Sequence, residues 1–466
     1  MFPWVEALKS VLPAVCFRDS DDDKASFGRD WTKHHEPAPS VVVLPGSVEE
    51  VQAVMRVAYE HEVAVVPSGG RTGLSGGAVA ANGEIVLALD RMNQILDYNA
   101  IDRQVRVQAG VVTQALQEFA EQQGLFYPVD FASAGSSQIG GNIATNAGGI
   151  KVIRYGMTRQ WVQGLKVVLA DGRVIDANQG LYKNATGYDL RHLMIGSEGT
   201  LGVVVEAQIQ LTSQPHDPQV VVLGVPSMAA VMEVMQAFRA QFELNAFEFF
   251  SKNALAALEE HRSITRPFET DSEYYVLLEM DKGEPEHADI FEERLMAVFE
   301  TVMEAGLVED GVISQSTQQA QDLWVLREGI SESIAPKIPY KNDISVLPSK
   351  VPEMLKAVEE HVNKSYAGWE IVWFGHIGDG NLHLNILKPA DMEKADFFKA
   401  CHGVTHDISA IIKQLGGSVS AEHGVGLLKK EYLGYSRSED EVQLMKLIKQ
   451  AFDPKGIMNP GKVFDL

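Results

Sequence analysis

Two histidines flank a strong turn signal in the C-terminal half of the sequence. The stretch Trp373–Ile386 reads WFGHIGDGNLHLNI, with His376 before and His383 after it, and Gly-Asp-Gly-Asn between two strand-like runs favours a tight turn. If those four residues form the loop, His376 lies opposite His383, with Cβ atoms about 4.5–5.5 Å apart on one face of a hairpin. Asn385 points to the same face. The pattern predicts either two imidazoles that can bind one metal or two histidines on the solvent side of a hairpin.

A second loop carries an acidic residue and a histidine side by side. Residues 420–426 read SAEHGVG, which places Glu422 and His423 between small residues and glycines. Adjacent Glu and His are common on protein surfaces, so this pair alone does not indicate a site. Carboxylate and imidazole are nevertheless ordinary metal ligands and proton acceptors, which makes the pair a candidate for both roles.

Three glycine-rich loops lie in the N-terminal half of the chain. The first, Pro67–Leu74, reads PSGGRTGL and follows the short β-rich run Val63–Val66. The second spans Gly135–Asn142 and the third Gly196–Gly202. Glycine lets backbone N–H groups turn toward one point and lets an anion approach closely. The first loop alone is also compatible with a plain strand–loop connection, but three such loops indicate backbone wrapped around a large, flat, anionic ligand.

Two common nucleotide motifs do not account for these loops. The sequence contains no Gly-x-Gly-x-x-Gly, the fingerprint of a Rossmann dinucleotide site. Gly456–Lys462 has the spacing of a P-loop, but Val463 occupies the position where Ser or Thr binds magnesium. We therefore expect neither a Rossmann site nor a P-loop.

The glycine loops resemble a known family. PSGGRTGLSGG, PVDFASAGSSQIGGNIATNAGGIKVIRYG and GYDLRHLMIGSEGTLG are similar, in order and spacing, to the FAD-binding domain of the vanillyl-alcohol-oxidase-type flavoproteins, and the tail FDPKGIMNPGKVF is similar too. The resemblance covers nearly the whole chain and extends to the branch that oxidises D-2-hydroxy acids. It implies an α+β fold with a two-subdomain FAD-binding domain, a substrate or cap domain with an antiparallel sheet, and a helical C-terminal segment.

The resemblance implies a set of FAD-binding positions. The first loop would hold the pyrophosphate, the second would lie near the flavin and ribityl chain, and Gly199–Val203 would lie on the adenine side. The expected contacts are Pro67, Ser68, Gly69, Gly70, Arg71, Thr72, Gly73, Leu74, Ser133, Ala134, Gly135, Ser136, Gly140, Gly141, Asn142, Ala144, Thr145, Gly199, Val203 and Asn459. Some relatives attach the flavin through a histidine in the first loop, which here has Arg71 and Thr72. We therefore expect non-covalent FAD.

The resemblance also implies a divalent metal bound by His376, His383 and Glu422. Two imidazoles and a carboxylate suit zinc, with manganese or iron possible, and leave coordination positions for substrate. A 2-hydroxy acid can chelate such a metal through its carboxylate and C2 hydroxyl, which lowers the pKa of the hydroxyl. His423 is then the candidate general base, taking the hydroxyl proton as hydride leaves C2 for flavin N5.

Three residues between the glycine-rich regions are candidate substrate ligands by the same resemblance, with Asn385 as a fourth. Arg327 can bind a carboxylate bidentately, Lys341 supplies a compact positive charge, and Ser331 lies one turn after Arg327 if that stretch is helical. Both cations could instead form surface ion pairs. Because the metal already holds one end of a hydroxy acid, further cations favour a diacid, 2-hydroxyglutarate, over lactate. Malate also fits, and a D-lactate or glycolate dehydrogenase of the same fold is the alternative.

The composition restricts the remaining partners. A net charge of −23 argues against nucleic acid and anionic membranes, and no apolar run reaches membrane-spanning length. The two cysteines, Cys16 and Cys401, provide neither a disulfide framework nor iron–sulfur ligands, so a cytoplasmic enzyme that passes electrons to an external acceptor is expected. The family likeness suggests an electron-transfer flavoprotein or a quinone, and the lack of an apolar anchor favours the former. A homodimer is possible. A non-catalytic FAD- or metal-binding subunit and a hydrolytic metalloenzyme are the rival classes.

The domain organisation follows from these motifs. Residues 1–215 are predicted to form the FAD-binding domain, 216–420 the substrate and metal-binding domain, and 421–466 a C-terminal segment that packs back on the FAD domain. Within the first, Ser47–Glu62 is predicted to be an amphipathic helix, with Ser47 and Glu50 as a capping box.

Overall fold

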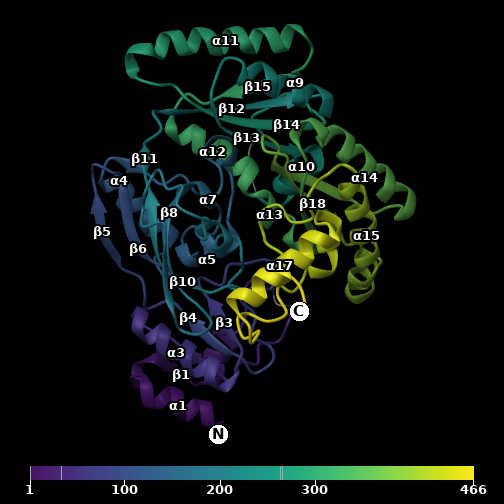
Figure 1. Cartoon of the computed structure of the whole chain (residues 1–466). Helices are drawn as coiled ribbons and strands as arrows, with labels where there is room; N and C mark the ends of the chain where they lie inside the picture. The colour runs from purple at the N-terminus through teal and green to yellow at the C-terminus, as the bar shows by residue number, and fades with distance from the viewer. Residues whose placement is uncertain (1, 33, 263, 265) are drawn as a thin grey trace. The chain divides into compact units, whose positions relative to one another are not determined.

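The computed structural model describes residues 2–32, 34–262, 264 and 266–466, apart from the side chain of residue 285 (Figure 1). The chain forms two compact units, and each is assembled from separate segments. Unit 1 comprises Met1–Gly148, Gly156–Gln214 and Glu422–Leu466, and unit 2 comprises Gly149–Tyr155 and Pro215–Ala421. Among the described residues, no helix combines the length and the apolar character needed to cross a membrane.

Unit 1 begins with a small, mainly parallel sheet in the order β1-β2-β4-β3. Its strands are β1 (Phe17–Arg18), β2 (Val41–Val43), β3 (Val65–Ser68) and β4 (Ile85–Ala88). The helices of this part are α1 (Pro3–Val11), α2 (Asp21–Phe27) and α3 (Val48–His61). The apolar faces of α1 and α3 pack with the strands into one buried cluster, as expected for amphipathic helices on a sheet.

The second sheet of unit 1 is antiparallel, in the order β5-β6-β10-β8-β9. It consists of β5 (Ile95–Asn99), β6 (Gln104–Gln108), β8 (Val162–Val168), β9 (Val174–Ala177) and β10 (Val203–Gln210), beside a two-stranded ribbon of β7 (Leu125–Phe126) and β11 (Thr212–Ser213). Its helices are α4 (Thr113–Gln122), α5 (Ile139–Thr145), α7 (Thr158–Trp161) and α8 (Arg191–Met194). Residues of α4, α5 and the strands share one buried cluster.

The C-terminal part of unit 1 contains α16 (Leu433–Ser436) and α17 (Glu439–Phe452). The chain beyond α17 binds to the first sheet, because the Val65 N–H donates to Ile457 O at 2.8 Å and the Asn459 N–H donates to Val65 O at 2.8 Å. Lys449 of α17 is buried and donates to Thr200 O and Met458 O, both at 2.7 Å. These bonds tie the end of the chain to β3 and to Thr200 of the third glycine loop.

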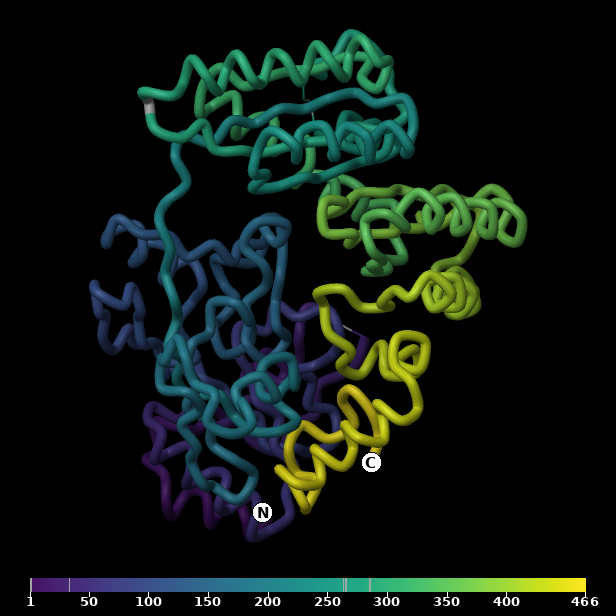
Figure 2. The backbone as a smooth tube through the Cα atoms, turned by 45° about the horizontal axis from the view of Figure 1, so that its top comes forward, coloured from purple at the N-terminus to yellow at the C-terminus, as the bar shows by residue number. Residues whose placement is uncertain are grey.

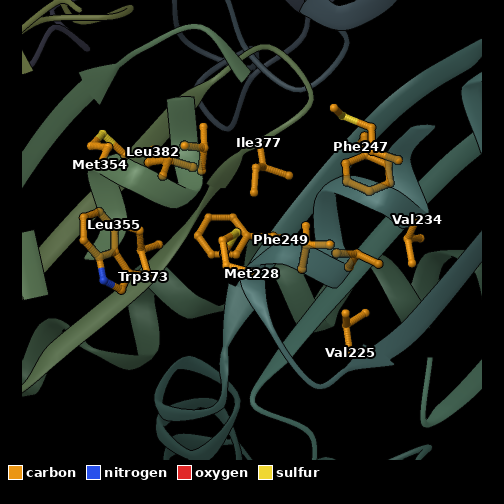
Figure 3. Packing of buried hydrophobic residues seen from close by; sticks show 14 of the residues in the cluster. Val225, Met228, Val234, Phe247, Phe249, Met354, Leu355, Trp373, Ile377 and Leu382 are labelled. Atoms are coloured by element: carbon orange, nitrogen blue, oxygen red, sulfur yellow. The ribbon is translucent and has the colours of Figure 1, made fainter. Parts of the chain in front are cut away.

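Unit 2 is built on an antiparallel sheet in the order β15-β12-β14-β13-β17-β18-β16. The strands are β12 (Pro218–Val225), β13 (Leu244–Ser251), β14 (Tyr274–Asp281), β15 (Asp310–Ile313), β16 (Pro339–Ser345), β17 (Ile371–His376) and β18 (Asn381–Leu387). One face packs against α9 (Met228–Arg239), α11 (Ala288–Glu304), α14 (Val351–Ser365) and α15 (Lys394–Gln414) (Figures 1 and 2). Figure 3 shows this core, in which Phe249 and Trp373 from neighbouring strands point toward the helices' side chains.

The opposite face of the sheet is covered only in part by helices. Its apolar cluster includes Phe250, Val372 and Phe374 of the sheet. The helices packed against them are α10 (Lys252–His261), α12 (Thr317–Glu328) and α13 (Ile330–Ser333). Toward β16 and the hairpin of β17 and β18, polar residues replace the apolar ones on this face.

A short segment from the N-terminal half belongs to unit 2. Helix α6 (Val152–Tyr155) packs against β13, and Ile153 contacts the main core. Arg154 forms an ion pair with Asp281 at 2.6 Å and a hydrogen bond to Asn245, and Lys151 lies 3.4 Å from a carboxylate oxygen of Glu279. These contacts fasten the segment to the unit 2 sheet.

The α+β fold expected from the sequence is confirmed, including both subdomain sheets and the antiparallel sheet of the second unit. The helix expected at Ser47–Glu62 is also confirmed, with Ser47 accepting the Glu50 N–H at 3.2 Å. The capping box is wrong in its second half. The Glu50 carboxylate accepts the N–H of Gly46 at 2.6 Å instead of that of Ser47, because it also faces Cys16 and Arg91.

Candidate active site

The polar face of the unit 2 sheet carries most of the expected metal and substrate positions. Register pairs Asp343 with His383 and His383 with Phe374, and in the next row pairs Lys341 with Asn385. Directly opposed residues share a face, and positions two apart on a strand return to it. The residues that share this face are Lys341, Asp343, Phe374, His376, Asn381, His383 and Asn385. The alternating residues, including Ile344, Leu382 and Leu384, are buried in the main core.

The hairpin pairing differs from the sequence prediction by two residues, because the turn begins one residue earlier than expected, and a shift of two keeps each side chain on its face. His376 lies opposite Asn381 and His383 lies opposite Phe374, so the turn is Ile377–Gly380. Ile377 is fully buried in the main core and therefore leaves the strand. Asn381 begins the second strand because its Nδ2 donates to Asp343 Oδ1 at 2.8 Å and Ile344 O at 3.0 Å. The two histidines are diagonal neighbours rather than opposed.

Despite that shift, the two imidazoles lie on one face and close together. Their ring centroids are 5.3 Å apart and the rings are nearly perpendicular, at 84°. His376 Nδ1 is 2.8 Å from Oε1 of Glu248, a fully buried carboxylate on β13. A carboxylate accepting from Nδ1 assigns the proton to that atom, so that Nε2 presents the lone pair that a metal needs.

Arg327 lies at the same carboxylate. Its Nη2 is 2.8 Å from Glu248 Oε2, and its guanidinium lies over the Phe374 ring at 4.9 Å from the centroid. Part of the guanidinium that was expected to bind a substrate carboxylate bidentately is therefore already used in an internal ion pair with Glu248. The Nε of Arg327 is buried and has no hydrogen-bond partner in the described chain, so one donor remains for a ligand.

Lys341 and Ser331 contact each other directly. Lys341 Nζ donates to Ser331 Oγ at 2.9 Å, which joins β16 to α13. The lysine side chain reaches solvent, yet burial of its ammonium lowers the pKa of Lys341 from its ordinary value. An anionic ligand bound next to Nζ would favour the protonated form of Lys341 and so oppose this shift.

Asn385 is 1 % exposed and uses its Nδ2 within the sheet, donating to His383 O at 3.1 Å and Val372 O at 3.3 Å. Its Oδ1 is buried with no partner among the described residues. The side chain thus offers one acceptor on the same face as Lys341.

The last residues of unit 2 bond to β16 and lead directly to the next two candidates, Glu422 and His423. Ser418 pairs with Ser345 of β16, and the Ala421 N–H donates to Asp343 Oδ2 at 3.1 Å. Glu422 is the residue that follows Ala421. His423 Nε2 lies 3.6 Å from Glu422 Oε1, so the two adjacent side chains turn toward one another.

Sequence reasoning missed Glu248, Asp343 and Asn381. Glu248 is a lone acid in the apolar strand LNAFEFFS, which is a signal for a paired buried charge. Asp343 stands two residues after Lys341, so strand alternation places both on one face. Asn381 looked like a turn residue because it follows Gly-Asp-Gly.

In unit 1 the three glycine loops converge. A Cβ on Gly70 would lie 2.2 Å from Ser136 O, and a Cβ on Gly199 would lie 3.2 Å from Pro67 Cγ. A Cβ on Gly140 would lie 2.7 Å from Ala109 Cβ. The contacts at Gly70 and Gly140 are shorter than real Cβ contacts and require glycine, and Gly199 has in addition a left-handed backbone, with φ of 71°. They bring the first loop against the second and the third.

The first loop has the features of an anion nest. Arg71 has a left-handed backbone, with φ of 59°, and its guanidinium is committed to Asp90 at 2.8 Å and to Gly69 O at 2.6 Å. Within the described chain, the backbone N–H groups of Gly70–Leu74 make no hydrogen bond. Successive free N–H groups in a turned backbone suit pyrophosphate oxygens. These residues therefore fit the pyrophosphate of FAD, with Arg71 shaping the loop rather than contacting phosphate.

Among the remaining cofactor candidates, some adjoin free space and others already hydrogen-bond within the protein. A Cβ on Gly141 would meet nothing within 4 Å, which leaves room beside α5 for a ligand. Asn142 instead donates to Thr113 Oγ1 at 2.7 Å, and Thr145 donates to Gly141 O at 3.1 Å. Asn459 donates from Nδ2 to Gly77 O and Glu198 O, while its Oδ1 is buried without a partner in the described part of the chain.

Comparison with known proteins agrees with this geometry. A model of the FAD binding domain matches residues 39–178, and a model of the C-terminal domain of FAD linked oxidases matches residues 214–463. The glycine loops lie in or beside the first match and the polar sheet face lies in the second. Unit 1 therefore binds FAD.

Two bacterial relatives match almost the whole chain. A D-2-hydroxyglutarate dehydrogenase of Stutzerimonas stutzeri is 56% identical, over 99% of this chain and 98% of that protein. A protein of the same name from Xanthomonas citri is 53% identical, over 99% of this chain and 97% of that protein. Among solved structures, p-cresol methylhydroxylase shares the fold with a TM-score of 0.74 at 17% identity, over 99% of this chain and 96% of that chain. The chain belongs to the family of FAD-linked oxidoreductases that includes these D-2-hydroxyglutarate dehydrogenases, and it is an FAD-dependent dehydrogenase.

Proposed function

We propose that this protein is an FAD- and divalent-metal-dependent dehydrogenase that oxidises D-2-hydroxyglutarate to 2-oxoglutarate. The observation that carries the proposal is the single sheet face on which His376, His383, Lys341 and Asn385 lie together. The names of the two bacterial relatives support the substrate.

The donor set supports a metal. His376 and His383 share one face of the sheet, and Glu422 directly follows Ala421, whose N–H donates to Asp343 on that face. The buried Glu248 orients His376 in the manner of a carboxylate–histidine–metal arrangement. Two imidazoles and one carboxylate match the donor set of an open zinc site, with manganese or iron as alternatives.

The rows of the sheet support a diacid. Asp343 and His383 form one row, and Lys341 and Asn385 form the next row on the same face. Two residues along a strand span about 7 Å, which separates the metal ligands from the lysine by a short carbon chain. Lys341, Ser331 and the Nε of Arg327 would bind the distal carboxylate. A monoacid such as lactate has no distal carboxylate for Lys341 to bind, whereas a diacid does.

The chain's own groups then divide the chemistry. Bound FAD would supply the hydride acceptor, and a divalent metal held by His376, His383 and Glu422 would lower the pKa of the substrate hydroxyl. His423 takes the hydroxyl proton on its imidazole. Lys341 and Ser331 hold the far end of the substrate, so that C2 keeps one orientation. FAD is non-covalent, because the first glycine loop offers Arg71 and Thr72 where a histidine would be needed.

Electrons leave through an external acceptor in this proposal. An electron-transfer flavoprotein is the acceptor we favour, since no Rossmann NAD fingerprint and no iron–sulfur ligand pattern occur in the sequence. Rapid reoxidation of the reduced enzyme by oxygen, with hydrogen peroxide formed, would contradict a dehydrogenase.

Anaerobic flavin spectra test the proposal. The purified protein is mixed with D-2-hydroxyglutarate before metal removal with EDTA, after removal, and after addition of zinc or manganese. We expect the flavin band to bleach only when metal is present. Equal bleaching of the metal-free protein would remove the metal from the mechanism. Bleaching by D-lactate but not by D-2-hydroxyglutarate would move the substrate to the monoacid.

A further inference from the structure

Glu198 occupies an unusual place in the third glycine loop. It is 8 % exposed and has a left-handed backbone, with φ of 52°. Its N–H donates to Ala144 O at 2.7 Å, and its carbonyl oxygen accepts from Asn459 Nδ2 at 2.7 Å. The backbone of Glu198 is thereby fixed to the second glycine loop on one side and to the C-terminal segment on the other.

The carboxylate of Glu198 accepts two backbone N–H groups. The Val425 N–H donates to Oε1 at 2.7 Å, and the Gly426 N–H donates to Oε2 at 2.8 Å. Hydrogen bonds of this length to a carboxylate are charge-assisted and about twice as strong as neutral ones. Burial raises the pKa of Glu198, and the two N–H groups act in the opposite direction. Each oxygen has one donor, so the side chain fits this pair of amides.

The segment that Glu198 holds follows directly after Glu422 and His423. Gly424 and Gly426 have φ of 79° and 50°, and a Cβ on Gly424 would lie 3.0 Å from Glu198 Oε1. The N–H groups of the next two residues, 427 and 428, both donate to Ser75 O, at 2.9 and 3.0 Å. The turn after His423 is therefore fastened at consecutive residues to loops of the FAD-binding unit.

We propose that Glu198 is a positioning residue for the reaction, which sets the placement of His423 and Glu422 against the FAD-binding loops. The inference rests on the proposed roles of His423 and Glu422. A carboxylate is suited to this task because it supplies two acceptors on a short, buried stem, and the left-handed turns at Gly424 and Gly426 let both amides face it. The proton acceptor and the cofactor loop are then linked through one side chain rather than through a flexible surface loop.

The test compares Glu198→Gln, Glu198→Asp and a control, Glu84→Gln, in the FAD-loaded enzyme. Gln keeps the size but places an NH2 donor against one N–H group, whereas Asp keeps both acceptors on a shorter stem. Glu84 is a buried carboxylate of the same unit that accepts the Asn82 N–H at 2.6 Å, remote in sequence from the 422–426 segment. Turnover with D-2-hydroxyglutarate, bound FAD and amide hydrogen exchange at Val425 and Gly426 are measured for each.

We expect E198Q to bind FAD in full, to exchange the two amides faster, and to lose about 10- to 100-fold in kcat, since small misplacements of reacting groups cost rates of that order. E198D should recover part of the rate, and E84Q should match the wild type per bound FAD. Wild-type kcat in E198Q, or a loss no larger than its loss of FAD, would overturn the proposal. His423→Ala separates the two claims, because wild-type turnover in that variant would contradict the role of His423 itself, while the exchange result for E198Q would still report on Glu198.

Discussion

The two units offer different parts of the chain to the ligands proposed for them. In unit 1 the glycine loops present backbone N–H groups, and the side chains of Arg71, Asn142 and Thr145 are used to hold the loops themselves. In unit 2 the backbone of β18 pairs with strands on both sides, and side chains of alternate residues share one face of the sheet. The first kind of site is sensitive to an added Cβ at its closest backbone approaches, such as Gly70, and tolerant of side-chain identity. The second is the reverse, and this difference can be tested.

The largest expected effect is at His383. Replacing it by Ala removes one ligand of the proposed metal, and turnover should fall by about 10³-fold, since a Lewis-acid metal contributes several kcal/mol to the transition state. Metal content by elemental analysis should fall while the flavin spectrum stays unchanged. His287→Ala, at an exposed histidine of the same unit, is the control. Loss of flavin in H383A would mean that flavin binding also depends on this residue of unit 2.

The second effect is at Gly70. In Gly70→Ala the new Cβ would approach Ser136 O, a backbone atom that cannot move without its loop. We expect the free energy of unfolding to fall by about 1–3 kcal/mol and FAD to be lost on gel filtration. Thermal denaturation and the visible spectrum measure both. Gly403→Ala, whose Cβ would meet only the Tyr366 hydroxyl at 3.4 Å, should leave both unchanged. A stable, FAD-loaded G70A would contradict the close approach.

A third, smaller effect is expected at Lys341. Lys341→Met should raise KM for D-2-hydroxyglutarate about 10-fold, because hydrogen bonds to charged groups contribute about 1.5–3 kcal/mol, and should leave D-lactate turnover unchanged. Burial lowers the pKa of Lys341, so the ammonium loses its proton at a lower pH than an ordinary lysine. For the wild type, kcat/KM with the diacid should therefore decline as pH rises through that lowered pKa. The K341M profile should lack this decline. Equal losses for both acids would argue against a distal carboxylate site.

The smallest effect is expected at Thr72. Thr72→Ala removes a side chain from the first glycine loop but leaves its backbone N–H groups in place, so FAD affinity should change by less than about 0.5 kcal/mol. Titration of the FAD-free protein with FAD, followed by flavin fluorescence, measures this. A tenfold loss of FAD affinity would show that side chains of the first glycine loop contribute to FAD binding.

The same difference explains how much the sequence revealed. Glycine runs mark close backbone approaches directly, so the three loops were found, and their convergence followed. The hairpin was predicted too, but its turn begins one residue earlier than expected and its pairing is shifted by two, because Ile377 suits a strand as well as a buried turn. The pairing of Glu248 with His376 and Arg327 was out of reach, since these residues lie on elements separated by long stretches of sequence and only sheet order brings them together. Glu198 was hidden for the same reason, as one acid among glycines whose partners follow more than 200 residues later.

The seven residues Gly149–Tyr155 have a consequence for the modularity of this protein. Because this piece of the N-terminal half is anchored in unit 2 by Arg154 and Lys151, and because unit 1 regains the chain after Ala421, neither unit is one continuous stretch. Recombination at a single junction would separate segments that belong to the same unit. If the sheet face binds the substrate as proposed, point changes on that face alter specificity more readily than the exchange of one module for another.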